Sequence, residues 1–363
     1  MKPFDPASAL SARISAIEEA AIIAMAQKAR EMKAQGLDVV SLTIGEPDFD
    51  TPAAIRQAAA DAMNAGFTHY APIAGYLELR AAIAARLNED NAIPVEASGV
   101  ILSNGAKQAL NNACFATLDA GDEVILIAPF WAAYEGIVKM AGGVPVIVSA
   151  GSDTGFKPAI EQVAAAMTSR TKLIMLNSPS NPSGAVWNPD ELQALADLVQ
   201  THPRCLVLSD EIYEDIWFEE RPMSIASLPG MFDRTITVNG FSKAYAMTGW
   251  RIGYAAGPTV LINAMRKLQS QSTSNPSSIS QWAAVEALNG PQDFIARNNE
   301  IFKARRDLVV SMLNQANGLS CPTPEGAFYV YPSCEGLIGK STPSGQLIKN
   351  DEDFVTALLA DEG

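Results

Sequence analysis

The hydrophobic positions between residues 99 and 257 form seven short runs, which are separated by polar, glycine-containing or helix-like stretches. The runs are residues 99–103, 123–129, 144–148, 172–179, 205–210, 235–240 and 251–257. Stretches with helical spacing, such as residues 106–119 and 188–202, lie between most of them. Continuous apolar strands that alternate with helices are typical of a parallel sheet covered on both faces. The pattern therefore predicts an α/β protein with a mostly parallel, seven-stranded sheet.

Helical spacing predominates outside this region. We predict helices over residues 15–35, 52–66 and 79–90 before the sheet. After it, we predict a helix over residues 294–316 and a short strand over residues 326–332. Because the alternation of strands and helices stops near residue 295, we expect a second, smaller α+β domain.

Composition and charge exclude several classes of protein. The 26 Lys and Arg residues are outnumbered by 40 Asp and Glu, and the net charge of −14 argues against nucleic acid as the main partner. With only two histidines, His69 and His202, neither a zinc site nor a Ser-His-Asp hydrolase has a credible set of residues. The sequence contains no signal peptide and no run of 18 apolar residues. We therefore expect a soluble, cytoplasmic protein with no membrane partner.

Polar or small residues follow five of the predicted strands. They are SNGAK (103–107), PFW (129–131), NSPSNPSG (177–184), DEIYE (210–214) and GFSKAY (240–245). Ligands of open α/β sheets bind at the carboxyl ends of the strands. The sequence therefore predicts one site that is assembled from these five segments.

Residues 240–253, GFSKAYAMTGWRIG, place a lysine in a small-residue turn after a strand and an arginine eight positions later. This stretch resembles, position by position, the lysine signature of class I aminotransferases, which are fold type I enzymes that use pyridoxal 5′-phosphate (PLP). The resemblance covers nearly the whole chain and is closest to the bacterial aspartate aminotransferase branch, which includes aspartate/prephenate enzymes. It implies that residues 46–295 form a large PLP-binding domain. Residues 1–45 would form an N-terminal arm and part of the small domain, and residues 296–363 would form the rest of the small domain, which we expect to be incomplete at its C-terminal end.

The resemblance also assigns residues to the reactive part of the cofactor. A PLP enzyme needs an amine to hold the aldehyde as a Schiff base and to move the substrate's α-proton, and Lys243 matches it. Asp210 matches the carboxylate that keeps the pyridine nitrogen protonated. Tyr213 and Asn181 match the residues that contact the 3′-oxygen, and Trp131 matches the residue that stacks on the ring.

The phosphate group needs backbone N–H groups and cations. Gly105, Ala106 and Lys107 open a helix directly after a strand, which is an anion-binding geometry. Arg251 matches the family's phosphate-binding arginine and can form two parallel hydrogen bonds. Tyr70 resembles the tyrosine that reaches the phosphate from a neighbouring subunit, so the resemblance implies a homodimer.

Substrate contacts follow from the same resemblance. Gly45 matches the glycine whose backbone faces the substrate carboxylate, and Trp131 and Asn181 are expected beside it. The stretch QSQSTSNP (269–276) lacks the arginine with which animal-type enzymes bind the distal carboxylate. In the bacterial branch a lysine in the phosphate turn does this, and Lys107 occupies that position.

Two positions depart from the family pattern. Many relatives have a phosphate-binding serine where this chain has Gly240. Prephenate-using relatives have a basic residue where this chain has Glu18, with Arg13 nearby. The alignment therefore leaves the use of prephenate open.

Three more acidic residues, Glu211, Glu214 and Asp215, follow Asp210. Their spacing looks like that of a metal-binding cluster. Because the family match and the lack of other ligands argue against a metal, we expect a solvated acidic face and no metal site.

The family pattern continues beyond residues 353–363, DFVTALLADEG, to an F-R-x-S-like segment whose arginine binds the substrate α-carboxylate. No arginine follows Arg306, and Arg305 and Arg306 lie in the predicted helix over residues 294–316. Either the sequence is an incomplete version of a longer protein, or the substrate is bound without the arginine that the family uses. We expect an incomplete sequence. The 363-residue chain should then bind PLP but transaminate poorly.

The resemblance implies transamination of an L-amino acid, with aspartate as the expected donor and 2-oxoglutarate as the acceptor, by a ping-pong mechanism. Two alternatives remain open. Another fold type I reaction, such as β-elimination from cysteine conjugates, would use the same lysine and aspartate. A PLP-sensing regulator would be no enzyme, but it would need a DNA-binding module, and only about 40 residues precede GEPDFD.

Overall fold

The computed structural model describes residues 4–15, 17, 21–42 and 44–362. The chain divides into two compact units. The smaller consists of Met1–Gly45, Phe302–Pro324 and Phe328–Gly363, and the larger of Glu46–Ile301 and Glu325–Ala327. The larger unit contains the sheet and all predicted site residues except Gly45. The assignment of residues 46–295 to PLP binding stays a prediction.

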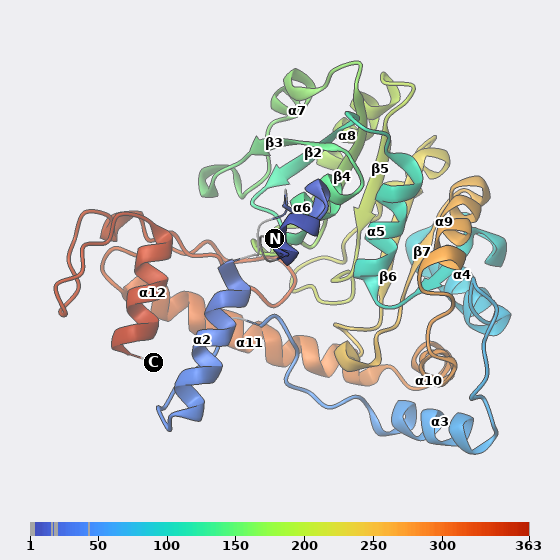
Figure 1. Cartoon of the computed structure of the whole chain (residues 1–363), viewed down its shortest axis with the longest axis horizontal. Coiled ribbons are helices and arrows are strands. Elements are labelled where there is room, and N and C mark those ends of the chain that lie inside the picture. The colour runs from blue at the N-terminus through green and yellow to red at the C-terminus, as the bar shows by residue number, and fades with distance from the viewer. Residues whose placement is uncertain (1–3, 16, 18–20, 43, 363) are drawn as a thin grey trace. The chain divides into compact units, whose positions relative to one another are not determined.

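One seven-stranded sheet forms the centre of the larger unit (Figure 1). Its strands are β1 (Val100–Ser103), β2 (Glu123–Ala128), β3 (Val144–Ser149), β4 (Thr171–Asn177), β5 (Leu206–Asp210), β6 (Thr235–Gly240) and β7 (Gly253–Ala256). The strand order is β1-β7-β6-β5-β4-β2-β3. Only β7 runs antiparallel to its neighbours. The predicted mostly parallel, seven-stranded α/β architecture is confirmed.

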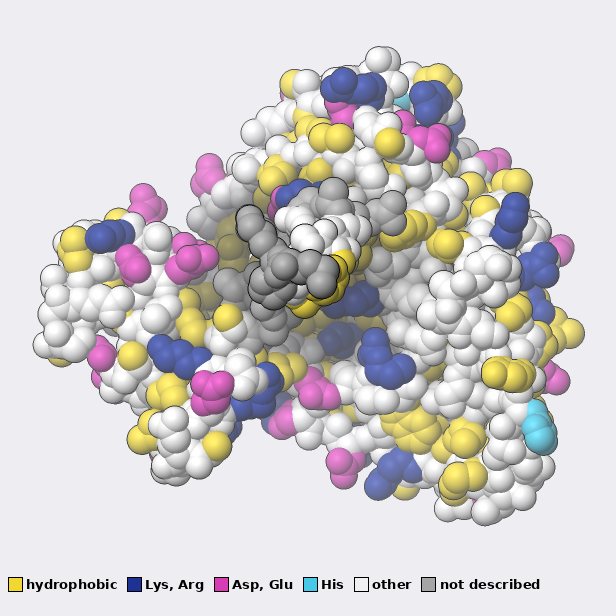
Figure 2. Space-filling model, in the orientation of Figure 1, with side chains coloured by type: hydrophobic (Ala, Val, Ile, Leu, Met, Phe, Trp, Pro, Cys, Tyr) yellow, Lys and Arg dark blue, Asp and Glu magenta, His cyan; other side chains and the backbone are white. Residues whose placement is uncertain are grey.

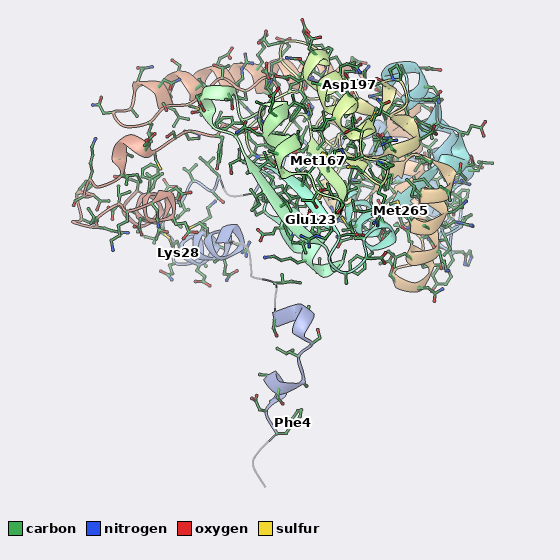
Figure 3. All side chains as sticks on the ribbon, turned by 90° about the horizontal axis from the view of Figure 1, so that it is seen from above. Phe4, Lys28, Glu123, Met167, Asp197 and Met265 are labelled. Carbon is green, nitrogen blue, oxygen red and sulfur yellow. The ribbon has the colours of Figure 1, made fainter. Side chains whose placement is uncertain are left out.

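Alternate residues of the inner strands face opposite covered sides of the sheet, which explains their continuous apolar runs, whereas the edge strand β3 is largely exposed. Val124 and Leu126 of β2 pack with α5 (Ala106–Thr117), α6 (Ala133–Met140) and α9 (Thr259–Ser272). Ile125, between them, packs on the other face with α7 (Ile160–Ala166) and α8 (Pro189–Gln200). Met265 of α9, labelled in Figure 3, is fully buried in the first of these clusters. Both faces of the sheet are therefore sealed by helices.

A third cluster covers β1 and β7 on the face opposite α5. It contains Leu102 and Tyr254 of these strands together with Leu79 and Leu87 of α4 (Leu77–Asn91). The helices α3 (Ala53–Asn64) and α10 (Ser278–Asn289) also contribute side chains to it. Burial on this scale stabilises a fold by about 25 cal/mol for each Å² of apolar surface removed from water. The burial of this cluster therefore fixes α4 against the sheet.

The strand registers bring the predicted site segments to one edge. Ser103 pairs with Gly253, which pairs with Gly240, and Asn177 pairs with Asp210. The carboxyl ends of β1, β2, β4, β5 and β6 therefore share the edge at which β7 begins. This is the edge where open α/β sheets bind ligands.

The remaining helices are α1 (Ala12–Ser15), α2 (Ala21–Ala34), α11 (Asp293–Gln315) and α12 (Asp351–Asp361). Short 3-10 turns cover Pro6–Ala9, Ala97–Gly99, Ser152–Thr154, Ile225–Ser227, Phe232–Arg234, Thr248–Trp250 and Glu335–Leu337. The predicted strand over residues 326–332 is wrong: this segment has only one isolated bridge, between Gly326 and Trp217. Its aromatic residues suit a pleated surface, but a strand also needs a partner with which to form a ladder.

Candidate functional site

Asp210 ends β5, and it is only 4% exposed. The hydroxyl of Tyr134 donates to its Oδ2 at 2.6 Å, and the backbone N–H of Ile212 donates to its Oδ1 at 3.3 Å. Burial raises the pKa of Asp210 to about 6, whereas these two hydrogen bonds and the charge of Lys243 act to lower it. The carboxyl group is therefore mostly ionised at pH 7, as a partner for a protonated ring nitrogen must be.

Lys243 lies in the turn after β6, with its Nζ 5.7 Å from the centroid of the Tyr213 ring. Burial lowers its pKa to about 8, and the negative charges of Glu46 and Asp210 oppose this effect. An amine must be unprotonated to attack a carbonyl carbon. With this pKa about a tenth of Lys243 is neutral at pH 7, far more than for a lysine with the ordinary pKa of 10.5.

The segment after β4 is joined to the segment after β5. Asn181 Nδ2 donates to the hydroxyl of Tyr213 at 3.4 Å. The side chain of Asn177 accepts a hydrogen bond from the backbone N–H of Asn181 at 2.6 Å and donates to the carbonyl of Asp210 at 2.8 Å. The structure therefore brings Asn181, Tyr213 and Asp210 together. Asn177, which our sequence analysis missed, links them.

The start of α5 and the guanidinium of Arg251 form the anion-binding end of the site. Gly105 caps α5 with φ 77°, and a Cβ there would lie 2.6 Å from Arg251 Nη2. Arg251 is held by the carbonyls of Thr248 (3.0 Å) and Asn104 (3.4 Å). The free N–H groups and the dipole of a helix start favour an anion, and the guanidinium adds a full positive charge. Glycine is required here, and the arrangement fits a phosphate group.

Lys107 and Trp131 lie together beside this end. The Lys107 ammonium is 4.6 Å from the centroid of the Trp131 ring, which is a cation–π contact. Burial lowers the pKa of Lys107, and the charge of Arg251 lowers it further. The Trp131 ring meets the Tyr134 ring edge-on, 5.6 Å between centroids. Tyr134 therefore connects Trp131 with Asp210, although our sequence analysis assigned it no role.

An open cleft of about 650 Å³ adjoins the anion-binding end. Of the predicted residues, Arg251 lines it, and Lys243 and Asp210 do not. Glu46 and Thr248 also line it, and a short hydrogen bond joins their side chains. Glu46 was missed as well, although the GEPDFD motif contains it.

Tyr70 is not part of this cluster in a single chain, because its side chain is 92% exposed. The backbone around it is nevertheless held. The hydroxyl of Ser278 donates to the carbonyl of His69 at 2.6 Å, and Gln281 Oε1 accepts from the N–H of Tyr76 at 2.8 Å. Tyr70 is thus presented to solvent by an anchored segment.

Gly45 belongs to the smaller unit. A Cβ at this position would lie 2.2 Å from the hydroxyl of Tyr329, so a side chain would fit here only if the Tyr329 ring moved. Glu18 and the side chain of Arg13, which bear on prephenate, lie outside the described residues.

The predicted solvated acidic face is wrong. Glu211 and Glu214 are 4% and 5% exposed. Two serine hydroxyls donate to Glu211 at 2.6 and 2.7 Å, and Asn91 donates to Glu214 at 2.7 Å. Burial raises the pKa of Glu211 to about 7 and that of Glu214 to about 8. Among the residues that the structure describes, no group of three or more His, Cys, Asp or Glu is placed to hold a metal ion.

The distribution of surface charge and the hydropathy of the helices bear on nucleic acids and membranes as partners. On the face shown in Figure 2, Lys and Arg side chains are interspersed with acidic and hydrophobic ones. No helix within the described ranges has both the length and the hydropathy needed to cross a membrane.

Comparison with known proteins gives the family. Residues 37–363 match the model for aminotransferase class I and II. The chain is 53% identical over 358 residues to a probable aspartate/prephenate aminotransferase of Rhizobium leguminosarum bv. phaseoli, covering 98% of this chain and 89% of the relative. It is 51% identical over 356 residues to the aspartate/prephenate aminotransferase of Cereibacter sphaeroides, with the same coverage of 98% and 89%.

Comparison with solved structures points to the same family. The crystal structure of the aspartate aminotransferase from Rhizobium meliloti matches with a TM-score of 0.94 at 47% identity, over 97% of this chain and 88% of that one. The aspartate aminotransferase from Thermus thermophilus, solved with maleate, matches with a TM-score of 0.86 at 45% identity, over 89% and 84%. The expected PLP fold type I is thereby confirmed. The chain belongs to the class I and II aminotransferases, as the resemblance of residues 240–253 predicted.

Proposed function

We propose that this enzyme transfers the amino group of L-aspartate to 2-oxoglutarate by a ping-pong mechanism. Aminotransferases of this family depend on PLP. One observation carries the assignment of the site: a buried carboxylate, a lysine with a lowered pKa and an anion-binding helix start share one edge of the sheet. The choice of aspartate is supported by relatives about half identical to this chain that are named aspartate or aspartate/prephenate aminotransferases.

Bound PLP supplies an aldehyde carbon on which amino groups are exchanged and a ring that withdraws electrons from the substrate. Lys243 is proposed to hold that carbon and, once released, to move the proton at the substrate Cα. Asp210 holds the proton of the ring nitrogen by charge attraction. Tyr134, through its 2.6 Å hydrogen bond, favours the ionised form of Asp210.

The other contacts orient the group. The N–H groups at residues 105–107 and the Arg251 guanidinium are proposed to bind the phosphate. Tyr213 and Asn181, which already lie together, are proposed to contact the 3′-oxygen. Trp131, whose ring meets the Tyr134 ring edge-on, would contact the cofactor ring.

Substrate recognition is assigned to Lys107 and Gly45. The Lys107 side chain is exposed, so a substrate can reach it, and its ammonium lies 4.6 Å from the centroid of the Trp131 ring. It is therefore suited to bind the distal carboxylate of an acidic substrate. The Thermus thermophilus relative was solved with maleate, which is a dicarboxylate. The Gly45 backbone is proposed to face the substrate carboxylate, and Trp131 and Asn181 are proposed to contact the substrate.

The functional form is proposed to be a homodimer in which Tyr70 of one chain contacts the phosphate held by the other. The 92% exposure of Tyr70 and its anchored backbone support this, because a backbone segment that is already held loses little further entropy on association. The cytoplasmic location stays a prediction.

The test is a single-turnover panel of amino donors. Purified chain loaded with PLP is mixed with aspartate, alanine or phenylalanine, and the visible spectrum is followed. We expect aspartate to give the fastest conversion to the pyridoxamine form, and addition of 2-oxoglutarate to regenerate the starting spectrum and release glutamate. A Lys243→Ala variant serves as the control without conversion. Release of ammonia with the oxo acid, or conversion by neutral donors alone, would contradict the proposal.

A further inference from the structure

A buried arginine outside the proposed cofactor contacts connects two turns of the site. Arg86 lies on α4, and its side chain is 14% exposed. Its Nη2 donates to both carboxylate oxygens of Asp215, at 2.8 and 2.9 Å. Its Nη1 donates to the hydroxyl of Tyr245 and, at 2.9 Å, to Oε1 of Gln292. One guanidinium therefore joins three segments to its own helix.

Two of those segments belong to the site. Asp215 lies two residues beyond Tyr213, and Tyr245 lies two residues beyond Lys243. The turn after β5 and the turn after β6 are thus tied to the same group. Arginine suits this task because its planar fork directs several N–H donors along fixed lines, which the single ammonium of lysine cannot do.

Charge and burial hold Arg86 in this place. Burial alone disfavours the charged form, but the carboxylate of Asp215 raises the pKa of Arg86, so the guanidinium stays protonated. Asp90 adds a second carboxylate, 3.4 Å from Nε. The Tyr245 ring lies 5.8 Å from the guanidinium carbon, and Tyr245 itself is 3% exposed. A buried ion pair that loses one partner leaves an uncompensated charge, so each partner keeps the other in position.

We infer that Arg86 is a positioning residue that fixes the Lys243 turn against the Asp210–Tyr213 turn and thereby keeps the half-buried Lys243 side chain in its place. Its hydrogen bonds go to Tyr245, Asp215 and Gln292, so it acts on Lys243 and Asp210 through Tyr245 and Asp215. The inference rests on the proposed function only in taking Lys243 and Asp210 as groups that act together.

The test uses the cofactor-free chain. The rate at which an amine-selective anhydride labels Lys243 is measured by mass spectrometry across pH, and its midpoint reports the pKa of the amine. That pKa is held to about 8 mainly by burial. Arg86→Lys keeps the charge but loses the fork, so the turn should open to water and the midpoint should rise by about 0.5 to 1 pH unit. Tyr245→Phe, which removes one hydroxyl, should shift it in the same direction and carries the test if Arg86→Lys does not fold.

Arg170→Lys is the matched control. Arg170 pairs with Glu123, the first residue of β2 (labelled in Figure 3), at the strand end away from the site. This variant should leave the Lys243 midpoint unchanged. The double variant, Arg86→Lys with Tyr245→Phe, should shift the Lys243 midpoint no further than the larger of the two single changes. Both changes break the same connection, the hydrogen bond between Arg86 and the Tyr245 hydroxyl.

An unchanged midpoint in folded Arg86→Lys and Tyr245→Phe would overturn the inference, and so would shifts that add in the double variant. No cofactor or substrate enters this measurement. Its failure is therefore distinct from failure of the proposed transamination.

Discussion

The hydrogen bond from Tyr134 to Asp210 offers a quantitative test of how the site holds a buried charge. Tyr134→Phe removes one hydroxyl, 2.6 Å from Oδ2, and leaves that oxygen without this donor. Hydrogen bonds to charged groups contribute about 1.5 to 3 kcal/mol, which corresponds to about 1 to 2 pKa units. The pKa of Asp210, about 6 in the native protein, should then rise to about 7 or 8.

This rise in the pKa of Asp210 changes its ionisation at physiological pH. At pH 7 the ionised fraction of Asp210 should drop from about nine-tenths to about half or less. Since only the carboxylate can hold a protonated ring nitrogen, PLP should bind more weakly at pH 7 and recover its affinity at higher pH.

PLP affinity is measured by absorbance titration between pH 5.5 and 9 for the native chain and Tyr134→Phe, with Tyr331→Phe of the smaller unit as control. The acidic limb of the Tyr134→Phe profile should move up by about 1 to 2 pH units, and that of the control should stay in place. Superimposable profiles for the native chain and Tyr134→Phe would refute the reasoning, because the hydrogen bond would then not govern the charge on Asp210.

Three more predictions concern single side chains. Burial raises the pKa of Glu211 from its ordinary value of 4.5 to about 7, so ionisation of this group destabilises the fold as the pH rises from 4.5 through 7. Above pH 7 the free energy of unfolding of Glu211→Gln, measured by urea denaturation, should exceed that of the native chain by up to about 3 kcal/mol. Equal stability of the two proteins at pH 8 would contradict this. Lys107→Ala should reduce turnover of aspartate about tenfold or more relative to phenylalanine, whereas equal losses would mean that it serves only the phosphate. Mixing inactive Tyr70→Ala and Lys243→Ala chains should restore one intact site per heterodimer, and no recovery despite subunit exchange would argue against Tyr70 acting in trans.

The strands and the main site residues could be predicted because their signals are local. Each strand is a short apolar run, and Lys243, Asp210 and Asn181 lie within a few residues of a strand end. The sheet edge then brings them together whatever the details of packing. The resemblance added their expected roles, since spacing alone does not distinguish Asp210 from a residue that caps a helix.

What the sequence did not reveal depends on distant partners. Tyr134 is 76 residues from Asp210, and Arg86 is 129 residues from Asp215, so neither contact leaves a local pattern. Glu214 has the spacing of a surface acid, yet it is buried because Asn91 of α4 satisfies it. The predicted strand over residues 326–332 failed for the same kind of reason. Strand formation depends on a neighbouring strand, and the local sequence does not supply one.

Reductive trapping tests the central claim most directly. The chain is incubated with PLP and treated with sodium borohydride, which fixes the cofactor aldehyde on the amine that holds it, and the labelled peptide is mapped by mass spectrometry. The account predicts one major label, on Lys243, and loss of that label in Lys243→Ala. A label on Lys107 or another lysine in the native chain, or undiminished labelling of Lys243→Ala, would contradict the assignment of the site.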